Sequence, residues 1–132
     1  MTMSNEVIEF DFGNIKYKYD HVAMIEINSG VEVDEEIANQ IISLLSGALK
    51  KPSVLIVNKK FDYSYTTEGM KILNDANLPD VLSTAIVVHN SSSEVMTKNQ
   101  IDIMKCFGRT NLQVFNNEES ALSWAQEVLN SQ

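Results

Sequence analysis

Short apolar runs alternate with helical patterns along most of the chain, and this alternation limits the fold more than any other feature. The expected strands are residues 22–27, 54–57, 84–89 and 112–115. A helical spacing of apolar residues follows each one, at about 35–51, 66–76, 94–107 and 118–129. Strands and helices that alternate at these lengths form βαβ units, in which the strands run parallel. We therefore expect an α/β domain with a largely parallel sheet.

The N-terminal part has a different pattern. Residues 6–12 and 15–19 alternate polar and apolar side chains around Gly13-Asn14, which predicts a hairpin with its turn at that pair. Asp20-His21 predicts a second turn, before the apolar strand 22–27. The expected fold class is thus a mixed sheet, in which an N-terminal antiparallel β-meander precedes β-α repeats. Its order is β-β-β-α-β-α-β-α-β-α, in one domain spanning residues 1–132.

Charge and composition limit the kinds of partner and the cellular location that we expect for this protein. The 132 residues carry a net charge of −8 and a single arginine, Arg109, which argues against nucleic acid and against an anionic membrane surface. Cys106 is the only cysteine, so no disulfide within the chain is expected. No apolar run is long enough to span a bilayer, and the N-terminus has no signal-peptide pattern. These features predict a soluble, cytoplasmic protein.

The connection that follows strand 54–57 is the strongest candidate site. It reads NKKFDYSYTTEG and combines three aromatic residues with four consecutive hydroxyl-bearing ones. Long loops between a buried strand and a helix often carry function. The candidate partner-binding or phosphorylation residues are Asn58, Phe61, Tyr63, Ser64, Tyr65, Thr66 and Thr67. A structural role explains the pattern equally well, with aromatics packed on the sheet edge and Thr66 capping the next helix.

Asparagines recur where the expected parallel strands end. In open α/β sheets, ligands bind at the carboxyl ends of the strands, although turn and cap chemistry also favours asparagine there. Met and Phe side chains on the helices behind this edge could line an apolar pocket. The candidate edge or pocket residues are Asn28, Met70, Leu73, His89, Asn90, Met96 and Phe107.

Catalytic chemistry has little support in the sequence. His21 and His89 are isolated from any nucleophile, and both are read as structural, with His89 the better functional candidate. Cys106 falls late in a predicted helix, where packing explains it. No HxH, CxxC, HExxH, GxGxxG or GxxxxGK[ST] pattern occurs, so we expect no metal, no cofactor and no enzymatic activity.

Four segments resemble the SpoIIAA-like, or STAS (sulfate transporter and anti-sigma antagonist), domains, in particular small single-domain members of a flavobacterial type. They read EFDFGNIKYKYD, VEVDEEIANQI, VLIVNKKFDYSYTTEGMKIL and LQVFNNEESALSWAQEVL. The resemblance implies a non-catalytic module that binds partner proteins. In anti-sigma antagonists, a serine in an Asp-Ser-Ser-Gly-like motif is phosphorylated. The matching stretch here is 65–69, where the Asp is missing and threonine replaces the serine.

Two functions follow as expectations. The first is a regulatory protein-interaction module with a hydroxyl-rich switch loop, in which Thr66 or Thr67 replaces the serine and Ser64 is a weaker candidate. The second is a carrier of a small apolar ligand, with a pocket lined by Met70, Leu73, Met96 and Phe107. A homodimer is also expected, because the meander leaves an edge strand exposed.

Overall fold

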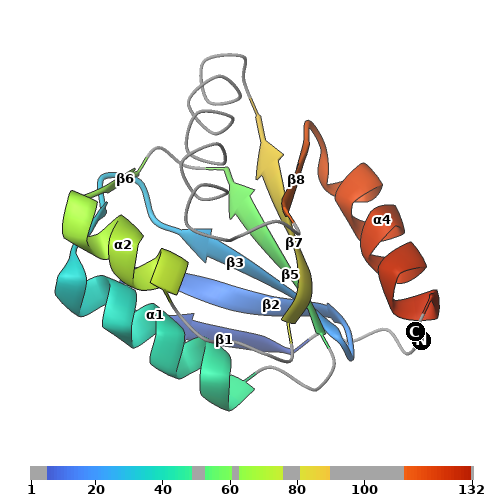
Figure 1. Cartoon of the computed structure of the whole chain (residues 1–132), viewed down its shortest axis with the longest axis horizontal. Helices are drawn as coiled ribbons and strands as arrows, with labels where there is room; N and C mark the ends of the chain where they lie inside the picture. Colours follow the sequence, from blue (N-terminus) through green and yellow to red (C-terminus); the bar gives the residue numbers. More distant parts are fainter. Residues whose placement is uncertain (1–5, 49–52, 61–62, 76–80, 90–111, 132) are drawn as a thin grey trace.

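A computed structural model of the chain describes residues 6–48, 53–60, 63–75, 81–89 and 112–131. Figure 1 shows a twisted sheet with helices on both sides. The elements, in chain order, are β1 (Val7–Phe10), β2 (Gly13–Tyr19), β3 (Val22–Ile27), β4 (Glu32–Val33), α1 (Glu35–Ala48), β5 (Ser53–Lys59), β6 (Ser64–Tyr65), α2 (Thr67–Asp75), β7 (Val81–Val88), β8 (Leu112–Phe115) and α4 (Glu118–Asn130). None of these helices is long and apolar enough to cross a membrane.

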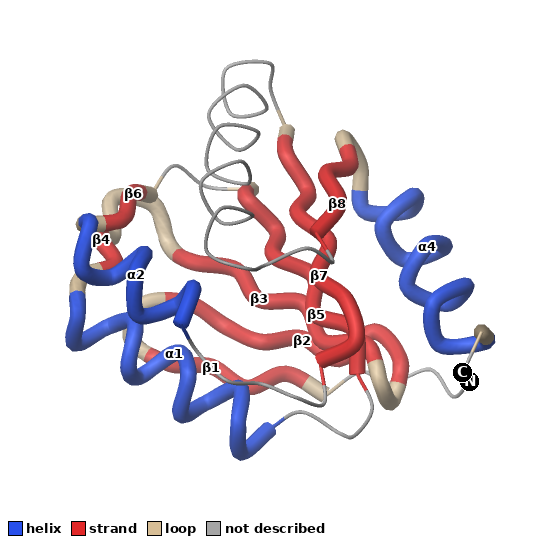
Figure 2. Tube along the Cα trace, in the orientation of Figure 1, coloured by secondary structure: helices blue, strands red, loops and turns tan. Residues whose placement is uncertain are grey.

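The main sheet has the strand order β1-β2-β3-β5-β7-β8. β1, β2 and β3 pair antiparallel, whereas β3, β5, β7 and β8 pair parallel. Figure 2 shows this sheet as a continuous band between the helices. The predicted mixed sheet, with an antiparallel meander at its N-terminal side, is therefore confirmed.

Alternate residues of β3 face two separate cores. Ala23 and Ile25 belong to the core covered by α1 and α2, whereas Val22 and Met24 face the core covered by α4. Every residue of β3 is buried, as expected for a central strand with helices on both faces. The helices α1 and α2 thus cover one face, and α4 covers the other (Figure 1).

Side chains cap all three described helices where the sequence predicts their starts. Asp34 Oδ1 accepts a hydrogen bond from the Ile37 amide at 2.9 Å, ahead of α1. Thr66 Oγ1 accepts from the Gly69 amide at 3.0 Å, at the start of α2. Asn117 Oδ1 accepts from the Ser120 amide at 2.8 Å, at the start of α4. Each cap satisfies an amide that has no partner within its own helix.

The first hairpin turns at a different place from the one predicted. Phe10 pairs with Gly13, so the turn is Asp11-Phe12, and Gly13 and Asn14 lie inside β2. A Cβ on Gly13 would collide with the backbone carbonyl of Glu26. This glycine therefore permits close packing of two strands and does not mark a turn. The second turn, at residues 20–21, is as predicted.

The candidate loop contains a strand that the sequence did not predict. β6 pairs parallel with β4, Glu32 opposite Ser64 and Val33 opposite Tyr65. The amides of Ser64 and Thr66 donate to the carbonyls of Val31 and Val33, both at 3.0 Å. This pair of two-residue strands holds the loop against the chain segment that precedes α1.

Several predictions lie outside the described residues. These are the third predicted helix and the candidate positions Phe61, Asn90, Met96, Cys106 and Phe107.

Candidate functional site

The carboxyl ends of β3, β5, β7 and β8 meet at one edge of the sheet, because these strands are parallel. Asn58, near the end of β5, is 1% exposed. Asn28, His89 and Asn116 follow β3, β7 and β8, and all three are exposed. Of these four residues, the structure joins Asn58 and His89 by a direct hydrogen bond.

Asn58 is the centre of a polar network, here called the Asn58 cluster, which comprises Lys16, Glu26, Asn58, His89 and Glu118. Asn58 Nδ2 donates to Glu26 Oε1 at 3.2 Å and to Glu118 Oε1 at 2.6 Å. His89 Nε2 lies 2.7 Å from Asn58 Oδ1, a geometry in which the imidazole N–H donates to the amide oxygen. Lys16 Nζ lies 3.4 Å from Glu26 Oε1. The cluster thereby connects β2, β3, β5, the end of β7 and the start of α4.

Because Glu26 and Asn58 of the Asn58 cluster are buried, its stability depends on the hydrogen bonds and charges within it. Glu26 is 5% exposed, and its carboxylate relies on Asn58 and on a lysine whose side chain is 37% exposed. Burying a carboxylate costs several kcal/mol unless hydrogen bonds and opposite charge compensate. Apolar residues at these positions would pack without that cost. A partly buried polar cluster at the edge where open α/β sheets generally bind ligands is therefore a candidate site as well as a structural link.

The sequence prediction found Asn58 and His89 but missed the other three members. The signal for Glu26 is a single carboxylate within the apolar strand Val22–Ile27. Asn14 and Asn58 pair with Glu26 on either side, so a polar row crosses three strands. Glu118 carries no such signal, because only the packing of α4 brings it to Asn58.

The second part of the edge is the rim, defined here as residues 63–67. The Tyr63 and Tyr65 rings lie 5.4 Å apart in an edge-on arrangement, and their hydroxyl oxygens are 3.1 Å apart. Lys59 Nζ lies 5.2 Å and 5.5 Å from the two ring centroids. Lys59, Tyr63 and Tyr65 are all half-buried.

Burial shifts the ionisation of these three groups. It raises the pKa of Tyr65 above the usual 10.0, and that of Tyr63 well above it. Burial also lowers the pKa of the Lys59 ammonium, while the two ring faces attract its positive charge. Both tyrosines therefore remain neutral hydrogen-bonding groups at neutral pH.

The rim hydroxyls differ in their roles. Thr66 Oγ1 accepts from the Gly69 amide and also donates to the Val33 carbonyl at 3.4 Å, so it is engaged in structure. Ser64 and Thr67 are exposed. Thr67 is the first residue of α2, where a negative charge is favoured by the helix dipole. The cap at Thr66 and the packing of the two tyrosines are as the structural reading expects, whereas partner binding or phosphorylation at this loop stays a prediction.

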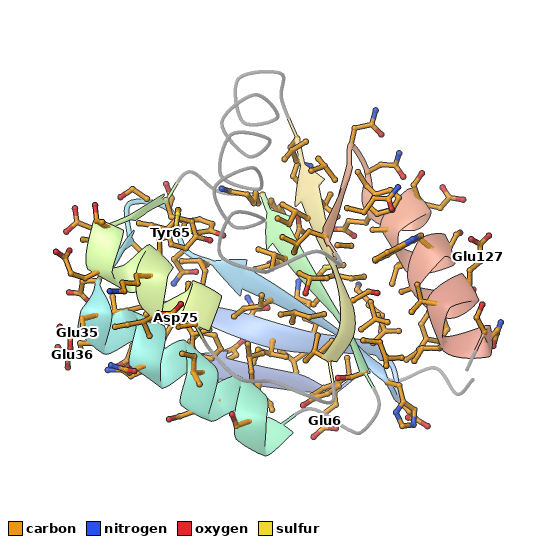
Figure 3. The ribbon with its side chains drawn as sticks, viewed as in Figure 1. Glu6, Glu35, Glu36, Tyr65, Asp75 and Glu127 are labelled. Carbon is orange, nitrogen blue, oxygen red and sulfur yellow. The ribbon has the colours of Figure 1, made fainter. Side chains whose placement is uncertain are left out.

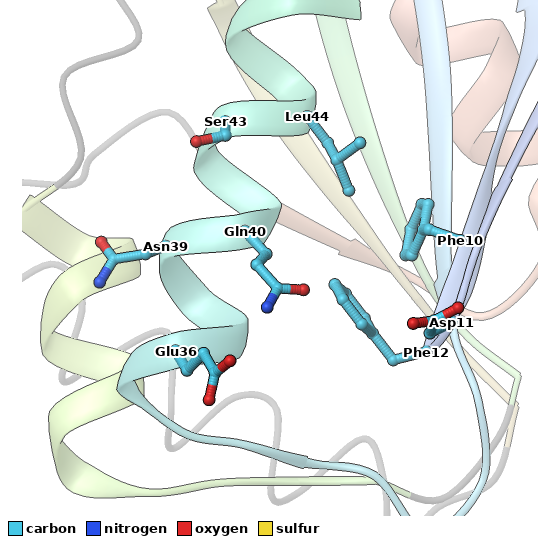
Figure 4. A pocket seen from close by; sticks show the side chains of 8 residues that line it. All are labelled: Phe10, Asp11, Phe12, Glu36, Asn39, Gln40, Ser43 and Leu44. Carbon is cyan, nitrogen blue, oxygen red and sulfur yellow. The ribbon is translucent and has the colours of Figure 1, made fainter.

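A pocket of about 610 Å³ opens between the β1–β2 turn and α1. Figure 4 shows its aromatic wall, formed by Phe10 and Phe12, facing the helix. Met70 and Leu73 do not line this pocket, so it differs from the one expected from the sequence. Leu73 instead packs on the core between the sheet and α1.

Within the described part of the chain, no group of three or more His, Cys, Asp or Glu side chains is placed to hold a metal ion. No known protein family matches the sequence. No curated protein is significantly similar to it in sequence.

Proposed function

We propose that this protein is a non-catalytic regulatory module of the SpoIIAA-like kind, which binds a partner protein through the rim. The observation that carries the proposal is the pairing of β4 with β6, which fixes the rim backbone by hydrogen bonds while Ser64 and Thr67 stay exposed. A surface that is already ordered loses little conformational entropy when it binds. Rigid presentation of hydroxyls and half-buried aromatics suits recognition by another protein.

The charge of the molecule supports a protein partner over a nucleic acid. The chain has a net charge of −8, and acidic residues flank the rim at Glu32 and Glu68. A partner with a basic patch is complementary to this surface.

Thr67 is the proposed switch residue. The hydroxyl of Thr66 is engaged in the helix cap, whereas Thr67 is exposed at the next position. A phosphate at Thr67 adds a charge of about −1.5 to −2 at the N-terminus of α2, where the helix dipole favours negative charge, so α2 tolerates it. The added charge changes the affinity for the partner and leaves the fold intact.

The test of the switch is phosphopeptide mapping by mass spectrometry of the protein isolated from the cells that produce it. The proposal predicts a phosphate on Thr67, lost in Thr67→Val and retained in Ser64→Ala. Absence of any phosphate on residues 64–67, under all growth conditions sampled, would remove the switch from the proposal. Partner binding through an unmodified rim would then be tested by itself.

A further inference from the structure

We propose that the pocket between the β1–β2 turn and α1 binds a small organic ammonium cation. This site is separate from the rim and does not depend on the proposed partner-binding function. Its volume of about 610 Å³ falls within the range typical of small-molecule sites, roughly 300–1,000 Å³. Its two walls come from different parts of the fold, the turn Asp11-Phe12 with the end of β1, and the first turns of α1.

The charges of the lining residues favour a positively charged ligand. Asp11 stands on the turn and Glu36 on the helix, and both carboxylates are exposed to solvent. None of the residues described as lining the pocket is basic. An anion would meet two negative groups without a compensating charge, whereas a cation is attracted from both walls.

The aromatic wall selects the kind of cation. The Phe10 and Phe12 rings lie 4.7 Å apart at 58°, and Phe12 is 8% exposed, so its ring is held firmly in place. Ring faces attract ammonium groups, most strongly those whose methyl or methylene groups shed water easily. Leu44 extends the apolar surface along the helix (Figure 4). A small inorganic cation must give up a tightly held water shell to reach such a wall, whereas an alkylated ammonium is weakly hydrated and uses both the wall and the carboxylates.

A polar side chain of the pocket can also form a hydrogen bond with the ligand. Figure 4 shows Gln40 extending from α1 toward Phe12, between the carboxylate of Glu36 and the apolar end at Leu44. Its amide offers a hydrogen bond to a hydroxyl or amide on the ligand. The favoured ligand therefore has an ammonium head with a short polar tail.

The test is a titration of the full chain with choline, followed by amide chemical shifts in NMR spectra. A saturable change centred on Asp11, Phe12 and Gln40 is expected. The uncharged carbon isostere of choline, 3,3-dimethylbutan-1-ol, should bind at least about tenfold more weakly, because it lacks the cation–π and charge interactions.

Three variants show which groups are responsible. The double variant Asp11→Asn/Glu36→Gln should weaken choline binding about tenfold, and Phe10→Leu several-fold. The control Glu127→Gln removes an exposed carboxylate of α4, on the opposite side of the molecule from Glu36 (Figure 3), and should leave the affinity unchanged. The NMR spectrum of each variant also reports whether it is folded. Equal binding of the uncharged isostere, or unchanged affinity in the double variant, overturns the proposal. So does the absence of any choline-dependent shift at the pocket.

Discussion

Gly69 lies within α2, where helix propensity alone favours alanine by about 1 kcal/mol. The structure predicts the opposite effect at this position. A Cβ on Gly69 would collide with the backbone carbonyl of Val33, and backbone cannot move aside cheaply. We expect Gly69→Ala to lower the free energy of unfolding by about 1–3 kcal/mol, as overpacking does elsewhere. Chemical denaturation measures the change.

Gly47 provides the matched control. It also lies in a helix, but a Cβ there meets no atom within 4 Å. Gly47→Ala should therefore raise the free energy of unfolding by up to about 1 kcal/mol. Stabilisation by both substitutions would show that the Val33 backbone of β4 does not approach α2 as closely as described.

We also predict that a substitution of Asn58 lowers the stability of the protein. Asn58→Ala should cost about 2–3 kcal/mol of unfolding free energy, because it removes a hydrogen-bond donor from Glu118 and leaves the buried Glu26 carboxylate with only the longer contact to Lys16. In a Glu118→Ala background the loss should be smaller by about 1 kcal/mol, since one of those carboxylates is already gone. Asn116→Ala, at an exposed asparagine on the same edge, should change stability by less than about 0.5 kcal/mol. Strict additivity of the Asn58 and Glu118 losses in denaturation curves would contradict the hydrogen bond.

At the scale of elements, the rim has a characteristic response to alkaline pH. Burial raises the pKa of Tyr63 in the folded protein well above 10.0, its value in the unfolded chain. The folded state therefore holds the Tyr63 hydroxyl proton more tightly than the unfolded chain does. The stability that the neutral Tyr63 side chain contributes is fully present below pH 10. Stability is lost as the pH rises above 10, where only the unfolded chain ionises readily.

Tyr63→Phe removes this ionisation and should flatten the loss of stability above pH 10. Tyr19→Phe, on a strand away from the rim, is the control for removal of a tyrosine hydroxyl. Denaturant unfolding at a series of alkaline pH values measures both. Identical slopes for the parent protein and Tyr63→Phe would mean that Tyr63 is not buried as the structure places it.

The sequence predicted those strands and helices whose signal lies within a short stretch of residues. The strand 112–115 and the final helix follow from an apolar run and an asparagine cap, and both are observed at those positions. The turn at Gly13-Asn14 was wrong because the same glycine serves strand packing, which only the partner strand reveals. β4 and β6 were missed because two-residue strands have no periodicity. A hydrogen bond of the Asn58 cluster joins residues 60 positions apart, so no local signal could assemble it.

At the scale of the whole molecule, three features face the carboxyl edge of one sheet. The Asn58 cluster lies on the side covered by α4, and the rim lies on the side covered by α1 and α2. The β1–β2 turn, which forms one wall of the pocket, reaches the same edge because Gly13 pairs with Ile27 at the end of β3. Among the described residues, the edge that parallel strands make available for binding thus carries the Asn58 cluster, the rim and one wall of the pocket.

Site-specific photo-crosslinking in the cells that produce the protein shows whether the rim is the surface that binds a partner. A photoreactive amino acid replaces Ser64 on the rim or, as the control, Ser123, an exposed residue of α4. We expect one defined protein adduct from position 64, a much lower yield from position 123, and an altered yield when Thr67→Glu is added. No adduct from position 64, or the same adducts from both positions, would contradict the claim that the rim is the partner-binding surface.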